Sequence, residues 1–266
     1  MECYWIRNSE YEIARLCKAS KGVAVLPLAS IESHGPHLPV GSDILCAEEL
    51  LRRLVARETV AVLPILTYSY VAHARMLPGA IHIPTETLTA TVEAICDEVY
   101  RNGFGKIVLL HCHGGNVTLD GEFLARMLER GKPYVVYSLP VFGSKSQEIA
   151  ATIQTKDWGH ACEMETSMNL VAAPELVNLE RLGKKTFPSR PAADLGAART
   201  AYDWTVRHPE MAVGEPQKAT KAKGERIFAI WEDEIVAIIR KIKRDRMTLP
   251  TLRDYVRKCK SPKSRG

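Results

Sequence analysis

Apolar residues follow two different patterns along the chain. Four short stretches are almost continuously apolar, which is typical of strands buried on both faces of a parallel sheet. They are residues 22–29, 59–66, 106–112 and 133–139. Amphipathic helices are predicted where apolar residues recur at helical spacing or turn signals begin a helical segment. These are residues 10–20, 43–57, 85–101, 197–207 and 225–246. The chain is therefore predicted to be an α/β protein with a mostly parallel central sheet flanked by helices.

The 266 residues show no internal repeat and no interdomain linker. A chain of this length can bury a full core, so residues 1–258 are predicted to form a single domain. Residues 240–266 hold eleven lysine and arginine residues against two aspartates, which places the net charge of +5 at the C-terminal end. Residues 259–266 are predicted to be a basic, disordered tail.

The basic end could contact nucleic acid or another anionic partner. It carries one aromatic residue, Tyr255, and no recognisable nucleic-acid-binding motif, so we expect a solvated terminus and no nucleic-acid partner. No apolar run is long enough to span a membrane, and the first residues lack the features of a signal peptide. We therefore expect a cytoplasmic protein with no membrane partner. Seven scattered cysteines without C-x-x-C spacing argue against disulfides and against a cysteine zinc site.

The first candidate site follows the strand predicted at residues 22–29. Glu32 and His34 are two residues apart, so in an extended chain both side chains project to the same side. Glycine and proline residues then turn the backbone, and Asp43 arrives at the start of the next predicted helix. Two carboxylates and an imidazole are ligands that Zn, Mn or Fe ions accept. The alternative is that Asp43 caps the helix and His34 packs in a turn.

Two further groups of polar residues lie where a strand or loop passes into a helix. His113 follows the strand predicted at residues 106–112, and the glycines after it let the backbone approach a bound group closely. His160, Glu163 and Glu165 open another predicted helix, and His160 and Glu163 would share one face if that helix begins early enough. Alternatively, His113 is a core or surface histidine and both glutamates are first-turn carboxylates favoured by the helix dipole. Because such passages lie along one edge of a parallel sheet, we expect the three groups to share a cleft.

Residues 67–84 lack periodicity and form a long excursion, as active-site loops often do. His73, Arg75 and His82 lie in this excursion and could bind the phosphate or carboxylate of an anionic substrate. Alternatively, they are surface residues or contacts to a neighbouring subunit.

Together these groups resemble the signature blocks of the creatininase (creatinine amidohydrolase) family. The matching segments are E-S-H-G-P-H-L-P-V-G-S-D at residues 32–43, H-G-G-N at 113–116 and H-A-C-E-M-E-T-S at 160–167, in the same order and spacing. The similarity covers about residues 23–171. It implies a single creatininase-like α/β domain, two divalent metal ions per chain (Zn, Mn or Fe), a hydrolase acting on an amide bond, and a homo-oligomer, usually a hexamer.

The resemblance also implies roles for individual residues. Glu32 and His113 match ligands of one metal, and His34 matches a ligand of the other. Asp43 matches the carboxylate that bridges the two metals. His160 matches the catalytic histidine of the family.

One position departs from the family pattern. Creatininase itself has a glutamate that binds the second metal two residues beyond the histidine of the second block, and this chain has Gly115 there. Glu163 is predicted to replace that metal ligand. Glu165 is the alternative ligand, or else a catalytic-site residue beside the metals. The change weakens the case for creatinine as the substrate, since the broader family includes formamidopyrimidine-ribotide deformylases and peptide-trimming members.

The expected reaction is hydrolysis of a carbon-nitrogen bond in the amide, formamide or cyclic amide of a small molecule. Two metals would activate a bridging hydroxide and polarise the scissile carbonyl. His160 would protonate the leaving amine as a general acid. The alternatives are a formamidopyrimidine-ribotide deformylase and a metal-binding protein without catalytic activity.

Overall fold

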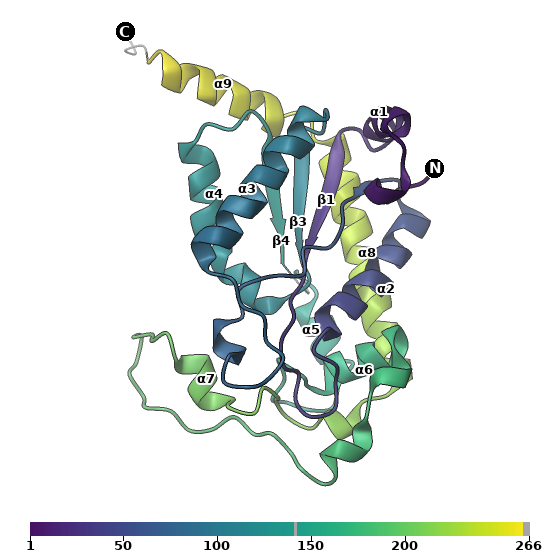
Figure 1. The fold of residues 1–266 in the computed structure, drawn as a ribbon, viewed down its shortest axis with the longest axis vertical. Coiled ribbons are helices and arrows are strands. Elements are labelled where there is room, and N and C mark those ends of the chain that lie inside the picture. The colour runs from purple at the N-terminus through teal and green to yellow at the C-terminus, as the bar shows by residue number, and fades with distance from the viewer. Residues whose placement is uncertain (141–142, 263–266) are drawn as a thin grey trace.

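A four-stranded parallel sheet forms the centre of the protein (Figure 1). The structure is a computed structural model that describes residues 1–140 and 143–262. The strands are β1 (Val23–Leu28), β2 (Ala61–Val62), β3 (Lys106–His111) and β4 (Val135–Leu139), in the spatial order β2-β1-β3-β4. Every residue of β1 and β3 is buried, which explains why both segments are almost continuously apolar. The predicted parallel sheet is confirmed.

The predicted strand at residues 59–66 is shorter than expected. Only Ala61 and Val62 pair regularly with β1. Pro64 has no backbone N–H to donate, so the regular ladder ends before it. The chain nevertheless stays beside β1, because the Leu66 N–H donates to the carbonyl of Pro27 over 2.9 Å.

Helices cover both faces of the sheet and complete a three-layer structure (Figure 1). One face is covered by α2 (Ser42–Arg57), α6 (Glu163–Ala172) and α8 (Lys221–Arg244), and the other by α1 (Glu10–Ala19), α3 (Thr85–Arg101) and α4 (Asp120–Glu129). Val23 and Val25 of β1 pack in the first of these cores, whereas Ala24 and Leu26 pack in the second. Successive side chains of a strand point to opposite faces, so the same strands support both cores.

Shorter elements join these layers. They are α5 (Ser146–Ala150), α7 (Asp203–Arg207), α9 (Thr248–Lys260) and the 3-10 helices η1 (Trp5–Arg7), η2 (Ala72–Ala74), η3 (Gly114–Leu119), η4 (Pro174–Leu176), η5 (Leu179–Leu182) and η6 (Pro216–Lys218). The helix predicted at residues 197–207 is present only as α7. Its start is fixed by Thr200, whose hydroxyl donates to the Asp203 carboxylate over 2.6 Å and whose N–H donates to the same carboxylate.

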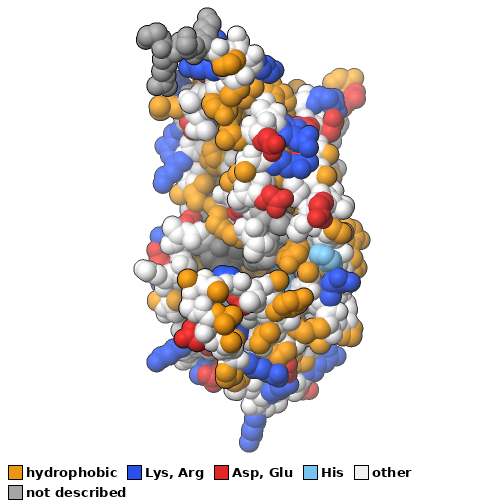
Figure 2. Space-filling view, turned by 90° about the vertical axis from the view of Figure 1, so that its left-hand side faces the viewer, with side chains coloured by type: hydrophobic (Ala, Val, Ile, Leu, Met, Phe, Trp, Pro, Cys, Tyr) orange, Lys and Arg blue, Asp and Glu red, His pale blue; other side chains and the backbone are white. Residues whose placement is uncertain are grey.

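The C-terminal end is more ordered than predicted. α9 projects at the top of the molecule in Figure 1 and continues through Lys260, so Cys259 and Lys260 are helical rather than disordered. Residues 263–266 lie outside the described residues. Figure 2 shows lysine and arginine side chains at several places on one face, interspersed with acidic and apolar ones. Within the described ranges, no helix combines the length and the apolar character needed to cross a membrane.

The contact between α6 and α8 generates a stability prediction. A Cβ atom at Gly224 of α8 would lie 2.0 Å from the carbonyl oxygen of Ser167 in α6. Gly224→Ala should therefore lower the free energy of unfolding by about 2 kcal/mol or more, because the two helices would have to move apart. Chemical denaturation followed by circular dichroism measures this change.

Gly121→Ala is the matched control. Gly121 lies in α4, and a Cβ atom there would have nothing within 4 Å. This substitution should leave stability unchanged or raise it by up to about 1 kcal/mol, because alanine favours a helix over glycine. Equal unfolding midpoints for the two variants would show that α6 and α8 do not pack as closely as described.

Candidate metal centre

Six of the seven predicted site residues meet at the carboxyl-terminal edge of the sheet. Glu32 and His34 lie in the loop after β1, and His113 follows β3. Asp43 is in the first turn of α2 and Glu165 is in the first turn of α6. Ligands of open α/β sheets bind at this edge, beyond the ends of the strands.

The carboxylate of Glu32 lies at the centre of three imidazoles. Its Oε1 is 2.9 Å from Nδ1 of His113 and 4.0 Å from Nδ1 of His160, and its Oε2 is 2.9 Å from Nε2 of His73. Glu32 is completely buried. Despite these short distances, no group in the described part of the chain donates a hydrogen bond to either oxygen of Glu32.

Asp43 lies between two of the histidines. Its Oδ1 is 3.1 Å from Nε2 of His34, and its Oδ2 is 3.0 Å from Nδ1 of His113. The hydroxyl of Ser30 donates to Oδ2 over 2.8 Å and holds the carboxylate in this position. Asp43 thus lies between the imidazole of His113, which also contacts Glu32, and the imidazole of His34.

Glu165 completes the cluster on the side of His34. Its Oε2 is 3.9 Å from Nε2 of His34 and accepts a hydrogen bond from the N–H of Ala161 over 2.5 Å. Burial raises the pKa of Glu165 to about 7, and the nearby Asp43 carboxylate contributes to the increase. This third, partly buried carboxylate is therefore costly to ionise unless a cation lies near it.

Backbone carbonyls orient the histidines of the cluster. His34 Nδ1 lies 3.2 Å from the carbonyl of Glu32, His113 Nε2 lies 3.1 Å from that of Tyr70, and His160 Nε2 lies 2.7 Å from that of Ser33. A carbonyl oxygen only accepts hydrogen bonds, so each of these nitrogens carries the proton. In a neutral ring, the other nitrogen then presents its lone pair to the carboxylates.

A lone pair facing a carboxylate oxygen is unfavourable unless a cation lies between them. Without a metal, the ring must take up a second proton. Although burial opposes this, the Asp43 carboxylate raises the pKa of His34 to about 9. A divalent ion can take the place of that proton, and a backbone hydrogen bond to the second ring nitrogen is the usual support of a metal-binding histidine.

The donor atoms fit divalent metal ions. Three groups have ligand atoms within 4.8 Å of one another: Glu32, His73 and His113; Glu32, His34 and His160; His34, Asp43 and Glu165. Imidazole nitrogens and carboxylate oxygens suit Zn, Mn and Fe. Because the groups share members, two ions held close together would use all of the carboxylates.

Glu163 does not belong to this cluster, and its expected role as a metal ligand is not supported. Its buried carboxylate contacts the ammonium of Lys223 and accepts hydrogen bonds from the N–H and hydroxyl groups of Thr155 over 2.8 and 2.7 Å. α6 begins at Glu163, so His160 precedes the helix and does not share a helical face with Glu163. Residues two apart on a helix point in nearly opposite directions, so only Glu165 faces the cluster.

His73 also belongs to the cluster, although no pattern in the sequence indicates it. From the sequence, His73, Arg75 and His82 could bind an anionic substrate or could be surface residues or contacts to a neighbouring subunit. Arg75 and His82 instead line a separate surface hollow with Ala80 and Pro84. No spacing rule connects His73 to Glu32, because η2 positions His73 through the tertiary fold.

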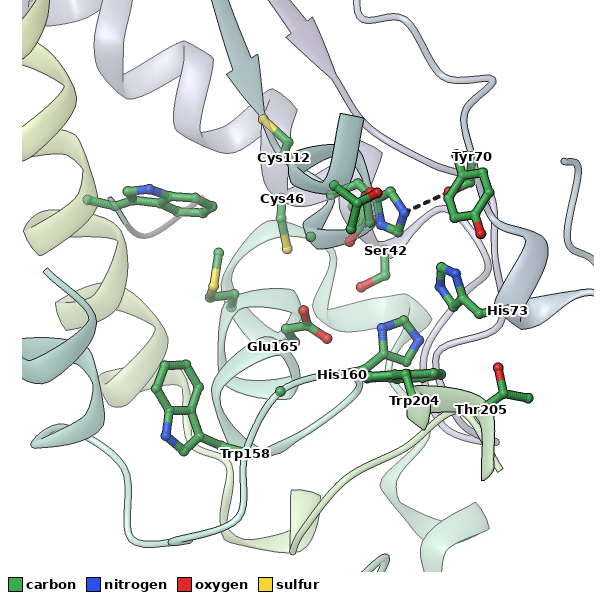
Figure 3. A pocket seen from close by; sticks show the side chains of 18 of the residues that line it. Ser42, Cys46, Tyr70, His73, Cys112, Trp158, His160, Glu165, Trp204 and Thr205 are labelled. Carbon is green, nitrogen blue, oxygen red and sulfur yellow. Dashed lines mark hydrogen bonds and ion pairs between the residues drawn. The ribbon is translucent and has the colours of Figure 1, made fainter. Parts of the chain in front are cut away.

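Trp204 of α7 was also missed. Its ring packs edge-on against His73 and His160, with centroid distances of 5.1 and 5.6 Å. Figure 3 shows it directly beside His160. The segment that carries Trp204 is low in periodicity, which left no sequence signal for its place in the site.

A cavity of about 550 Å³ opens onto the cluster. Asp43, His73, His113, His160 and Glu165 contribute to its wall, and Figure 3 shows His73, His160 and Glu165 directed into it. The volume is in the range of small-molecule sites. The fold and site therefore define an α/β protein with a buried carboxylate-imidazole centre at the base of a small-molecule cavity.

Comparison with known proteins identifies the family. The family model named Creatininase, described as creatinine amidohydrolase, matches residues 8–239. The chain belongs to the creatininase family. It is 28% identical to a creatinine amidohydrolase of Pseudomonas putida over 87% of this chain and 93% of the relative. It is 30% identical to a mycofactocin precursor peptide peptidase of Mycobacterium tuberculosis, over 80% of this chain and 82% of the relative.

A third relative and a solved structure extend this comparison. The third relative is a 2-amino-5-formylamino-6-ribosylaminopyrimidin-4(3H)-one 5'-monophosphate deformylase of Methanothermus fervidus, 26% identical over 77% of this chain and 75% of that protein. A solved structure of manganese creatininase superposes with a TM-score of 0.77 at 23% identity, over 92% of this chain and 100% of that one. The creatininase-like fold is confirmed. The family also supports amidohydrolase activity in general.

The opposite orientations of Glu163 and Glu165 generate a prediction about metal content. Protein purified without chelator should contain two equivalents of divalent metal per chain. Glu165→Gln should lose about one equivalent, because an amide is a poorer ligand than a carboxylate at a site that Glu165 shares with His34 and Asp43. Elemental analysis by mass spectrometry measures the content.

Glu163→Gln is the control and should keep both equivalents, because its carboxylate contacts Lys223 and Thr155 instead. Circular dichroism should show that both variants are folded. A loss of metal from Glu163→Gln together with full content in Glu165→Gln would contradict the assignment.

Proposed function

We propose that this chain is a metal-dependent amidohydrolase with two divalent ions per chain. Glu32 and His113 would hold one ion, His34 and Glu165 the other, and Asp43 would contact both. The observation that carries the proposal is the orientation of the histidines: one ring nitrogen of His34 and of His113 is held by a backbone carbonyl, and the other faces a buried carboxylate. When bound, such ions polarise a scissile carbonyl and lower the pKa of water toward neutrality.

The relatives support hydrolysis of a carbon-nitrogen bond. An amidohydrolase, a peptidase and a formylamino deformylase all act on such bonds, although their substrates differ. The common element among them is thus the bond type. We therefore assign this chain the same reaction class, with an amide, formamide or cyclic amide as the substrate.

His160 is placed to move the proton that this reaction requires. Burial and the neighbouring His34 lower the pKa of His160 to about 4, so its ring is neutral at pH 7. Its Nε2–H is engaged with the carbonyl of Ser33, which leaves Nδ1 on the side of Glu32. Nδ1 can accept a proton from the attacking water and then donate it to the leaving nitrogen. Trp204 packs against the ring and limits its rotation.

A ribotide substrate is less well supported than an uncharged amide. Among the described residues that line the cavity there is no lysine or arginine to pair with a phosphate. Of the three side chains that could bind a phosphate, Arg75 and His82 line a different hollow, and only His73 lines this cavity. The Methanothermus fervidus relative favours the deformylase alternative, and we retain it for testing. A homo-oligomer, usually hexameric in this family, and a cytoplasmic location remain predictions.

A turnover screen tests the proposed reaction. Metal-loaded protein is incubated with creatinine, lactams, short peptides and formamidopyrimidine ribotides, and release of amine or formate is measured. At least one of these amides should be hydrolysed. His160→Ala should lower kcat at least about a hundredfold, the usual contribution of a positioned acid-base group.

His82→Ala serves as the matched control, because His82 lies outside the cavity and should not affect kcat. Full turnover by His160→Ala would overturn the proton-transfer role. A protein that binds two metals yet hydrolyses none of the compounds would favour the alternative of a metal-binding protein without catalytic activity.

A further inference from the structure

The cavity above the cluster has two chemically different ends. One end carries the titratable side chains His73 and His160. The other end is apolar, because its lining residues Cys46, Cys112, Met168 and Trp231 belong to one hydrophobic cluster and Trp158 packs against that cluster. In Figure 3, Cys46 and Cys112 lie above Glu165, Trp158 lies below it on the left, and His160 lies to its right.

Helix geometry joins the apolar end directly to the cluster. Met168 follows Glu165 by three residues on α6, and Cys46 follows Asp43 by three residues on α2. Side chains three apart on a helix are neighbours on the same face. Each helix therefore places an apolar side chain beside a carboxylate of the cluster, about one turn or ~5 Å further along.

The described residues at the apolar end include no charged side chain. Cysteine and methionine behave as soft, polarisable apolar side chains, and the other two side chains at this end, Trp158 and Trp231, carry indole rings. Among the described lining residues there is no lysine or arginine at either end. An anionic group placed there would lose its hydration without gaining an ion pair, which is strongly unfavourable.

We propose that the substrate of this site carries an uncharged apolar group, about the size of a benzene or indole ring, that fills the apolar end of the cavity. The scissile amide then lies beside Asp43 and Glu165, where the cluster begins. This inference rests on the proposed amidohydrolase function and adds the class of substrate. A cavity of about 550 Å³ accommodates such a ring together with the amide.

Hydroxamates test the inference without requiring turnover, because they bind through the metal centre and vary only in the attached group. The affinities of acetohydroxamate, benzohydroxamate and 4-carboxybenzohydroxamate for the metal-loaded protein are measured by isothermal titration calorimetry. Benzohydroxamate should bind at least about tenfold more tightly than acetohydroxamate, because its ring is buried in the apolar end. 4-Carboxybenzohydroxamate should bind at least about tenfold more weakly than benzohydroxamate, because its carboxylate would be buried in the apolar end.

Substitutions in the apolar end test whether the ring of benzohydroxamate binds there. Trp158→Ala should weaken benzohydroxamate about tenfold and leave acetohydroxamate within about twofold. Trp5→Ala is the matched control, since Trp5 is also a partly buried indole but packs against Phe104 and does not line this cavity. It should change neither affinity. Met168→Gln places a polar amide of similar length at the apolar end and should also weaken benzohydroxamate while sparing acetohydroxamate. It replaces Trp158→Ala in the test if that variant does not fold.

The outcomes separate this inference from the proposed function. Equal affinities for acetohydroxamate and benzohydroxamate, or tighter binding of the 4-carboxylate, would overturn the apolar substrate class while the metal centre stands. Failure of all three hydroxamates to bind would overturn the metal centre and this inference with it.

Discussion

The structure depends on the electrostatic balance of three carboxylates, the buried ones of Glu32 and Asp43 and the partly buried one of Glu165. They lie among imidazoles whose other nitrogens are held by backbone carbonyls. Without cations, protons must compensate this charge, which is reflected in the raised pKa values of His34 and Glu165. With divalent ions, the same atoms become ligands. The surrounding layers of the fold hold these groups in place against their mutual repulsion.

The carboxylates and imidazoles are held together by strands that end, and helices that begin, at the same edge of the sheet. β1 and β3 lead into the loops that carry Glu32, His34 and His113, and the first turns of α2 and α6 supply the remaining carboxylates. Since both helices continue with apolar residues on the same face, the polar cluster passes directly into an apolar wall. One set of helix contacts thus determines both the chemistry of the centre and the shape of the cavity beside it.

Most of the fold and the first two motifs could be predicted because they depend on local pattern. Continuous apolar runs mark buried strands, and Asp43 follows a turn rich in glycine and proline. The choice between Glu163 and Glu165 could not be made from the sequence, because it depends on the residue at which α6 begins; the structure places Glu165 against the cluster and Glu163 against Lys223 and Thr155. A shift of a few residues in that start rotates every later side chain, and the sequence does not define helix ends so closely.

The sequence by itself determined the order of strands and helices along the chain. It also determined that carboxylates and imidazoles follow the strand ends, since both features depend on neighbouring residues. Only the tertiary structure decided that His73 and Trp204 join the centre while Arg75 and His82 stay outside it. Glu32 and His73 come from separate loops, and α7 reaches the cavity from far along the chain. Contacts of this kind arise from the packing of whole layers, and no local periodicity specifies them.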